Sequence, residues 1–431
     1  MIKTYNIKDL SVDEILAREE NTVDVSGTVA AVIDNVRSNG DAALAEYTEK
    51  FDKVKLDSII VTREEINEAV ASLDEEFLNI LRDAAKNIEH YHKCQIRQGY
   101  AVTDKEGVIL GQRVTPIEKV GVYVPGGSAP LPSSVLMNII PAKIAGVPFI
   151  AMATPPGRDG KVNPAILAAA DIAGATVIYK MGGSQAIAAL AYGTETVTAV
   201  HKIVGPGNAF VAEAKRQVFG KVGIDMIAGP SEIIVLADST CDPTVVAADM
   251  LSQAEHDRLA SAILVTDSEE LAAKVADELE VQIPQISRAD IARASIDTYG
   301  KIIITDTFAR AIDMVNELAP EHLEVMVDDP FAVLSDIKNA GSIFLGKNCP
   351  EPLGDYFAGT NHVLPTSGTA KFSTPLSVDD FIKKSSYIYY TREALEKEAW
   401  RVNTFAKREQ LTAHARSAVV RFEKGGKNDP V

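Results

Sequence analysis

A short polar stretch lies inside an otherwise apolar, alanine-rich part of the chain and could bind a metal ion. The stretch LSQAEHDRL, residues 251–259, carries Gln253 and His256 three residues apart. On a helix, residues at this spacing share one face, so an amide oxygen and an imidazole nitrogen could reach the same point. A lone histidine on a helix is more often a core residue that hydrogen-bonds a backbone carbonyl. The pair alone leaves both interpretations open.

The other histidines favour the metal interpretation. The chain has seven histidines, and four of them lie in dense polar clusters. Besides His256 these are His322 in APEHLEV, His362 in GDYFAGTNHVLPT and His414 in LTAHARS, and Asp355 opens the cluster of His362. A metal held by imidazole nitrogen together with carboxylate or amide oxygen would be zinc or a neighbouring transition metal. The cysteines are too scattered in the sequence to contribute metal ligands. They are Cys94, Cys241 and Cys349.

A second pair of polar residues, Glu321 and His322, is suited to proton transfer. The pair lies between the end of an expected helix near Leu318 and the apolar run 323–327. Histidine titrates near neutral pH, and a glutamate can act beside it if its pKa is raised, so together they suit general base chemistry. Because Pro320 precedes them, a solvated turn is an equally good interpretation from spacing alone.

Three glycine-rich segments could contact a dinucleotide. They are YVPGGSAP (123–130), MGGSQAIAAL (181–190) and GPGNAF (205–210), and each follows an apolar run. Turns between a strand and a helix are the usual place for such a cofactor. None of the three is a GxGxxG motif. In GPGNAF, Phe210 stands where the third glycine would be. Taken alone, each is more typical of a simple tight turn.

The elements that must position these residues form an α/β pattern. Short apolar runs from residue 121 onward alternate with alanine-rich helical stretches, and a second such series runs from SEIIVLAD to SIFLG. This alternation predicts βαβ units around parallel sheets, one sheet for each series. The first hundred residues have mainly helical spacing, and residues 377–431 are expected to form helices too polar to build a core alone. The helix that carries Gln253 should begin at Asp242 as cap and Pro243 in its first turn.

Composition limits the setting of the protein. A length of 431 residues corresponds to about two to three domains. The net charge of −17 argues against nucleic acid or an anionic membrane as the main partner. We expect no signal peptide in the first twenty residues and no membrane helix, since prolines and Lys143 interrupt the most apolar region, 129–156. The three cysteines form no CxxC motif, and the cytoplasm fits best.

Eight motifs in consistent order resemble the histidinol dehydrogenase family. They cover nearly the whole chain and are YVPGGSAPLPSSVLMNIIPAKIAGV, GGSQAIAALAYGTE, VGPGNAFVAEAKRQV, AGPSE, LSQAEHD, APEHLEV, GDYFAGTNHVLPT and EQLTAHA. Each motif alone would be modest support, but eight in register are specific. The resemblance implies an enzyme that oxidises L-histidinol to L-histidine in two NAD-dependent steps, through a histidinal intermediate, with one zinc ion per subunit.

The resemblance also implies roles for individual residues. The zinc ligands would be Gln253, His256, Asp355 and His414. His322 would take the alcohol proton while hydride leaves for NAD, and Glu321 would activate the water that adds to the aldehyde. The zinc would mainly hold the substrate's amine and imidazole, so its ligands also count as substrate-binding, together with His322.

Further positions follow from the same motifs. Ser231 and Glu409 match substrate-binding positions. Tyr123, Gln185 and Asn208 match positions that contact NAD. His362 receives no settled role. One departure is Gln410, which stands where the family usually has glycine, and we expect the site to survive with a stiffer turn.

The architecture implied is two α/β domains of incomplete Rossmann type with helical N-terminal and C-terminal segments. The first domain would be discontinuous. Both terminal segments would reach over the partner of a homodimer with shared active sites, and the C-terminal tail would complete the partner's site. The expected boundaries are 1–17 for the N-terminal tail, 18–122 and 232–376 for the first domain, 123–231 for the second and 377–431 for the C-terminal tail.

Three alternatives can be compared with this assignment. A paralogue could act on another polar alcohol or diol, such as a sulfonated propanediol, with the same zinc and NAD residues; Glu409 argues for histidinol. A thiol-dependent aldehyde dehydrogenase would need a nucleophilic cysteine, and all three cysteines lie outside the polar clusters. A zinc hydrolase could use the same ligands with Glu321 as base. An assay for NADH distinguishes the hydrolase from the dehydrogenase.

Overall fold

The described part of the chain folds into two compact units, the first with two sheets and the second with one. The computed structural model describes residues 2–9, 14–15, 24–126 and 130–423. The first unit runs to Ile96 and continues from Ile117 to Phe381, and the second unit comprises the described part of 97–116 and 382–431. Parts of the predicted N-terminal tail, residues 1, 10–13 and 16–17, lie outside the described residues.

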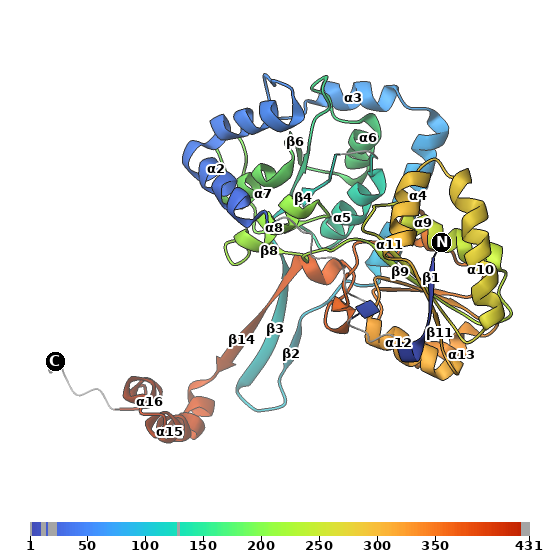
Figure 1. Ribbon diagram of the computed structural model, residues 1–431. Helices are drawn as coiled ribbons and strands as arrows, with labels where there is room; N and C mark the ends of the chain where they lie inside the picture. The colour runs from blue at the N-terminus through green and yellow to red at the C-terminus, as the bar shows by residue number, and fades with distance from the viewer. Residues whose placement is uncertain (1, 10–13, 16–23, 127–129, 424–431) are drawn as a thin grey trace. The chain divides into compact units, whose positions relative to one another are not determined.

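A six-stranded parallel sheet forms one half of the first unit (Figure 1). Its strands, in order across the sheet, are β1 (Lys3–Asn6), β11 (Lys301–Ile304), β10 (Ser261–Thr266), β9 (Glu232–Ala237), β12 (His322–Met326) and β13 (Ser342–Leu345). The register pairs His322 of β12 with Ile233 of β9. This register places the start of β12 beside the start of β9.

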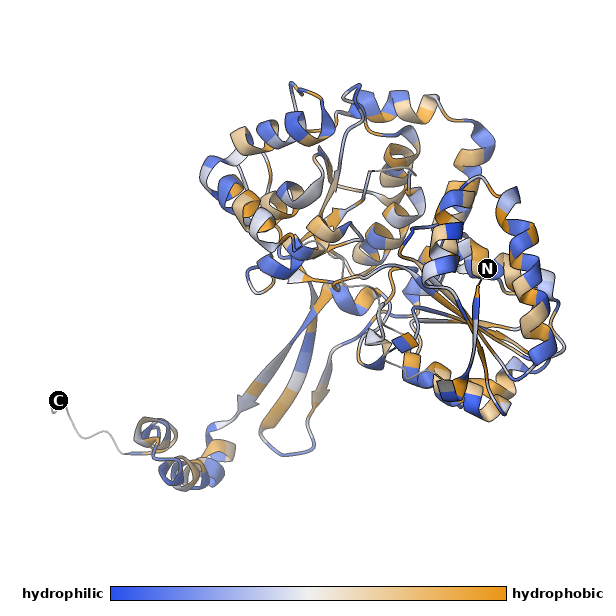
Figure 2. Ribbon diagram, viewed as in Figure 1, coloured by the Kyte–Doolittle hydropathy of each residue, from blue (hydrophilic) through white to orange (hydrophobic). Residues whose placement is uncertain are grey.

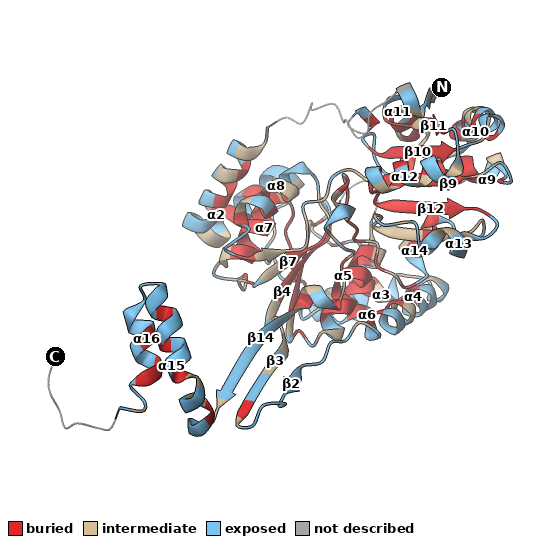
Figure 3. Cartoon of the chain, turned by 90° about the horizontal axis from the view of Figure 1, so that it is seen from below, coloured by how far each residue is buried: buried red, intermediate tan, exposed pale blue. Residues whose placement is uncertain are grey.

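Both faces of this sheet are covered by helices. Successive residues of β9 point to opposite faces, with Ile233 in one apolar cluster and Ile234 in the other. Strands buried on both faces need continuous apolar runs. Figure 2 shows the strands of this sheet as mainly hydrophobic, and Figure 3 shows β10 and β12 as buried. The helices that contribute to the two clusters are α9 (Pro243–Ala254), α10 (Glu269–Gln282), α11 (Ala289–Thr298), α12 (Phe308–Leu318) and α13 (Pro330–Leu334).

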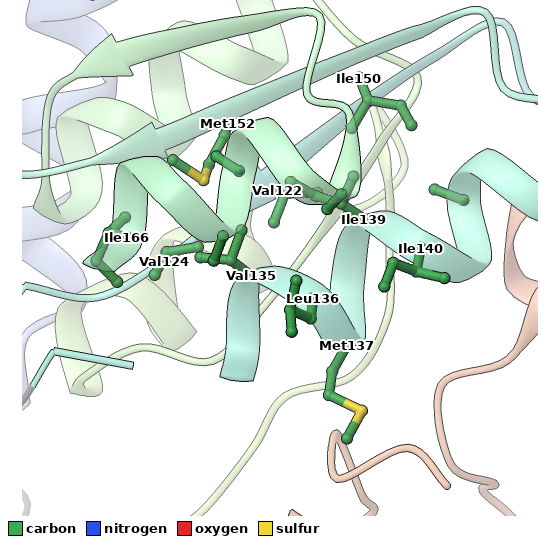
Figure 4. Packing of buried hydrophobic residues seen from close by; sticks show 14 of the residues in the cluster. Val122, Val124, Val135, Leu136, Met137, Ile139, Ile140, Ile150, Met152 and Ile166 are labelled. Carbon is green, nitrogen blue, oxygen red and sulfur yellow. The ribbon is translucent and has the colours of Figure 1, made fainter. Parts of the chain in front are cut away.

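A five-stranded parallel sheet forms the other half of the first unit. Its strands, in order, are β6 (Val177–Lys180), β5 (Phe149–Thr154), β4 (Lys119–Tyr123), β7 (Lys202–Val204) and β8 (Gly223–Ile224). Four helices follow its strands: α5 (Pro132–Ile144), α6 (Pro164–Ala173), α7 (Gly183–Tyr192) and α8 (Ala209–Val218). Figure 4 shows Val122 and Met152 from the strands packed with Val135 and Ile139 from α5. The predicted class, α/β with two parallel sheets, is confirmed.

The N-terminal helices pack with the five-stranded sheet. They are α2 (Ser26–Tyr47), α3 (Arg63–Ala71) and α4 (Glu75–Lys93). Leu81 and Ile88 of α4 share one apolar cluster with Leu136 of α5, whereas Val32 of α2 joins the cluster of α7. The sequence analysis placed residues 18–122 in one domain with 232–376. In the structure, the apolar faces of these helices instead pack against helices of the five-stranded sheet. The domain boundaries themselves stay a prediction.

The second unit contains an antiparallel sheet and a helix pair. Its elements are β2 (Tyr100–Val102), β3 (Val108–Pro116), β14 (Ile382–Tyr390), α15 (Arg392–Arg408) and α16 (Thr412–Val419). Gly111 pairs with Tyr387, and a Cβ on Gly111 would lie 2.2 Å from the tyrosine ring. The prediction of helices throughout 377–431 is wrong at 382–390. The run IKKSSYIYY is rich in aromatic residues and favours a strand, and its partner lies far away in the sequence.

Short elements complete the described part of the chain. They are the helix α14 (Glu351–Tyr356), a π-helical turn η2 (Thr48–Asp52) and four 3-10 turns, η1 (Ile7–Asp9), η3 (Ile283–Gln285), η4 (Thr369–Lys371) and η5 (Val378–Phe381). None of the helices in the described ranges is long and apolar enough to cross a bilayer.

Candidate active site

Glu321 and His322 lie at the start of β12 and are buried. The helix α12 ends at Leu318 as expected, and Ala319 closes it in a left-handed conformation with φ 51°. Glu321 is 7% exposed and His322 is 4% exposed. The interpretation of this pair as a solvated turn is therefore wrong.

The imidazole of His322 has one nitrogen fixed and one available. Its Nδ1 lies 2.9 Å from the carbonyl oxygen of Glu232, so Nδ1 carries the hydrogen and donates it. Its Nε2 makes no hydrogen bond with any other described residue. Burial, with smaller contributions from the neighbouring His256 and His362, lowers the pKa of His322 to about 3, although the hydrogen bond with Glu232 opposes this shift. The ring is neutral at physiological pH, and Nε2 is its basic atom.

Glu321 is held by the same residue, Glu232, that holds His322. Its Oε2 accepts the N–H of Glu232 at 2.8 Å and lies 3.6 Å from Nδ1 of His322. Burial raises the pKa of Glu321 well above its usual value, although the hydrogen bond from Glu232 opposes this shift. Residue 232 therefore anchors both members of the proton-transfer pair, one through its N–H and the other through its C=O.

Two carboxyl groups of α14 face the free nitrogen of His322. Nε2 lies 3.7 Å from Oε1 of Glu351 and 3.8 Å from Oδ1 of Asp355. The two acids are four residues apart and lie on one side of α14. Single ligand atoms of these three residues come within 4.8 Å of one another, a spacing that could hold a metal ion. The sequence interpretation included Asp355 but missed Glu351; the spacing of four residues between them was the available signal.

Further acids lie behind Glu351 in the interior. Oε1 of Glu324 accepts the backbone N–H of Glu351 at 2.7 Å, and the nearby carboxyl of Asp249 on α9 helps to raise the pKa of Glu324. Burial raises the pKa of Glu324, Glu351, Asp249 and Asp355. A divalent cation suits such a cluster, since it would take the place of the protons. Glu324 and Asp249 were also missed, although each is a carboxylate inside an otherwise apolar run.

Gln253 points into the protein without a partner, whereas His256 lies beyond the helix. Asp242 caps α9 and Pro243 begins it, as expected. Gln253 is 1% exposed, and neither its Oε1 nor its Nε2 hydrogen-bonds any described residue. Because α9 ends at Ala254, the exposed His256 sits in the following turn, with its N–H donating to the carbonyl of Gln253 at 3.1 Å. The predicted common helical face is therefore wrong, although the two residues remain adjacent.

His362 connects this cluster to the helices of the five-stranded sheet. Its Nδ1 lies 3.1 Å from the carbonyl oxygen of Asp355 and 3.6 Å from that residue's Oδ1. Its Nε2 lies 3.3 Å from the hydroxyl of Ser134, in the first turn of α5. Burial lowers the pKa of His362 to about 4, so the ring is neutral. The half-buried Ser231 directly precedes β9, and its carbonyl accepts the N–H of Ser261.

The remaining predicted site residues of the tail belong to the second unit. Glu409 closes α15, and His414 lies exposed on α16. Gln410 between them has φ 65°, a left-handed conformation that glycine adopts without strain. This observation explains why a glycine suits the position.

The three residues expected to contact NAD lie at one edge of the five-stranded sheet. Tyr123 ends β4, Gln185 lies in the first turn of α7 after β6, and Asn208 caps α8 after β7. The hydroxyl of Tyr123 accepts the N–H of Gly183 at 3.0 Å. Gln185 is 1% exposed, and its Oε1 has no hydrogen-bond partner among the described residues. The carboxyl edge of a parallel sheet is where α/β proteins bind their ligands.

Comparisons with known proteins agree with this arrangement. A family model described as histidinol dehydrogenase matches residues 16–422. Histidinol dehydrogenase from Clostridium acetobutylicum is 57% identical over 404 residues, 94% of each chain, and that from Bacillus subtilis is 55% identical over 394 residues, 91% of this chain and 92% of the other. The crystal structure of histidinol dehydrogenase from Elizabethkingia anophelis superimposes with a TM-score of 0.93 at 39% identity and covers 98% of each chain. The chain therefore belongs to the histidinol dehydrogenase family.

Proposed function

We propose that this protein oxidises L-histidinol to L-histidine, the final conversion of histidine biosynthesis, in two NAD-dependent steps through L-histidinal. Membership of the family supports the reaction. The observation that carries the assignment is the buried pair Glu321 and His322, which the backbone of Glu232 holds in place. The neutral imidazole presents its free nitrogen toward Asp355, an expected metal ligand.

The two residues would divide the proton transfers. His322 would take the alcohol proton on Nε2, because its Nδ1 hydrogen is committed to the carbonyl of Glu232. Glu321 would take a proton from the water that adds to the aldehyde. Its raised pKa makes it a stronger base than an exposed glutamate. Burial excludes bulk water from both steps.

Gln253, His256, Asp355 and His414 would hold a zinc ion. The amide of Gln253 supports this assignment, because it is buried and lacks a partner among the described residues. The bound ion would hold the amine and imidazole of the substrate. Ser231 and Glu409 would contact the substrate as well, together with His322 and the metal ligands.

Tyr123, Gln185 and Asn208 would contact NAD, which accepts the hydride. The buried, unpaired Oε1 of Gln185 is an acceptor that a ligand could satisfy. Asn208 already caps α8 through its side-chain oxygen, so its amide nitrogen is the atom left to reach a ligand.

A homodimer with shared active sites is part of the proposal. The second unit carries Glu409 and His414, yet its apolar cluster consists of Ala399, Ala418 and Val419 with Phe422 against them. Large apolar side chains of this unit are exposed, and they include Trp400, Phe405 and Ile388. Such a surface is typical of a protein interface, and a two-fold axis would let each tail complete the partner's site. We place the enzyme in the cytoplasm, consistent with its three unpaired cysteines.

An assay of NADH formation tests the function. The zinc-loaded protein should reduce NAD with L-histidinol and do so far less well with a panel of other polar alcohols, including a sulfonated propanediol. Chelation should abolish the reaction and added zinc should restore it. Preference for another diol would identify a paralogous activity, and substrate turnover without any NADH would indicate a hydrolase.

A further inference from the structure

The turn after β7 depends on a glycine with an unusual backbone. Gly205 has φ +113°, and a Cβ built on it would lie 2.1 Å from the carbonyl oxygen of Tyr123. A larger residue would therefore be strained and would also clash with the end of β4. The turn continues through Pro206 and Gly207 to Asn208, the cap of α8.

A buried ion pair binds both peptide groups of this glycine. The N–H of Gly205 donates to Oδ2 of Asp225 at 2.8 Å. The Nζ of Lys215 donates to the carbonyl of Gly205 at 3.0 Å and forms an ion pair with Asp225. The side chains of Lys215 and Asp225 are 4% and 1% exposed. Two opposite charges from different elements thus fix a single residue from both sides.

Fold stability alone does not account for this pair. Removing two charges from water costs several kilocalories per mole, and replacing a buried pair by apolar residues is often neutral or stabilising. Lys215 and Asp225 direct their hydrogen bonds to the one residue whose conformation sets the direction of the turn. A charged pair therefore provides geometry that two apolar side chains could not.

The position of the turn affects all three residues expected to contact NAD. Lys215 lies on α8, the helix that Asn208 caps, so the helix and its preceding turn are joined by the same side chain. The backbone of Tyr123 packs against Gly205, and the hydroxyl of Tyr123 accepts the N–H of Gly183 in the turn that precedes Gln185. A shift of Gly205 would therefore move a contact of Tyr123 as well as Asn208.

We propose that Lys215 and Asp225 are positioning residues for the dinucleotide, acting through Gly205 to fix the turns that hold Tyr123 and Asn208. This inference rests on the proposed NAD site. The proposed role concerns cofactor binding alone. Lys215 lies on α8 and Asp225 directly follows β8, whereas the metal cluster belongs to β12 and α14.

The double variant Lys215→Met/Asp225→Leu tests the proposal, since it removes both hydrogen bonds without leaving an unpaired charge. We expect the dissociation constant of NAD, measured by calorimetry without substrate, to rise on the order of 10-fold or more, the loss that corresponds to about two hydrogen bonds. The KM for NAD should rise in parallel. The KM for histidinol and kcat at saturating NAD should stay within about twofold, as for a change in cofactor binding alone.

A matched control uses an ion pair at the start of β7, the strand that ends directly before Gly205. Lys202 begins β7 and binds Asp380 at 3.0 Å, and Lys202→Met/Asp380→Asn should leave NAD binding unchanged. In Lys215→Met/Asp225→Asn, the new amide can still accept the N–H of Gly205, and binding should be partly restored.

The possible outcomes separate this inference from the proposed function. Failure of the wild-type protein to bind NAD would overturn the proposed function and this inference with it. Normal NAD binding by the wild type and by the folded Leu-containing variant would overturn the inference alone. If that variant does not fold, Lys215→Met/Asp225→Asn decides, because it lacks the ion pair and the hydrogen bond from Lys215 to Gly205, so an unchanged dissociation constant in the folded protein would also contradict the proposal.

Discussion

Replacing Gln253 with leucine should stabilise the zinc-free protein but remove most of its stabilisation by zinc. The side chain is 1% exposed, and both amide atoms lack a hydrogen-bond partner among the described residues. A buried polar group without a partner costs about 1–3 kcal/mol. Leucine has a similar size and no polar atom, so Gln253→Leu should stabilise the zinc-free protein by about that amount.

Zinc should stabilise the wild type far more than the variant. Free zinc at about 100 times its dissociation constant stabilises the wild type by about 2.7 kcal/mol. A variant that binds zinc about 100-fold more weakly would gain only about 0.4 kcal/mol at the same concentration. Most of the wild type's zinc-dependent stabilisation should therefore be absent from Gln253→Leu, and NADH formation should be lost.

Urea unfolding with chelator and with zinc measures both effects. Thr48→Val is a matched control, because Thr48 is 2% exposed and its hydroxyl also has no partner among the described residues. It lies in η2, apart from the metal cluster, so its effect should be the same in both conditions. Equal zinc stabilisation of Gln253→Leu and wild type, or a less stable zinc-free variant, would refute the assignment of Gln253 as a ligand.

Three further predictions concern the proton-transfer pair, the shared site and the tail. Glu321→Gln should retain part of the oxidation of histidinol but lose most of the oxidation of added histidinal, whereas His322→Gln should slow both by on the order of 100- to 10,000-fold; equal impairment of both half-reactions by Glu321→Gln would show that the roles are not divided. His322→Ala and His414→Ala should each be inactive, and mixing them under subunit exchange should restore about a quarter of wild-type activity, since about half of the dimers are mixed and each holds one intact site; mixed dimers seen by native mass spectrometry without activity would assign each tail to its own chain. Gln410→Gly should raise the thermal midpoint of the protein, because it relieves a left-handed conformation worth about 1 kcal/mol, and an unchanged or lower midpoint would contradict that strain.

The sheets and most helices could be predicted because local patterns determine them. The runs IIVLA in β9 and AILV in β10 are continuous and apolar, as is typical of strands buried on both faces. The start of α9 was visible in Asp242 and Pro243. Its end was not, because no glycine or proline marks Ala254 and the turn at His256 depends on tertiary contacts.

The sequence pattern could not predict which distant segments of the chain pack or pair with each other. The strand β14 lies in a polar segment and pairs with β3, more than 260 residues earlier. The helices α2 to α4 have ordinary amphipathic faces, and nothing in them says which sheet they cover. The buried acids Glu324 and Glu351 were missed for a related reason, since only the folded chain brings β12, α9 and α14 together.

The stoichiometry of the reaction tests the central claim most directly. Zinc-loaded protein should form about two NADH for each L-histidinol consumed, with L-histidine as the product, since each active site would carry out both oxidations. Absorbance of NADH and chromatography of the product on the same sample give both quantities. One NADH per histidinol with histidinal released, or no NADH at all, would contradict the account.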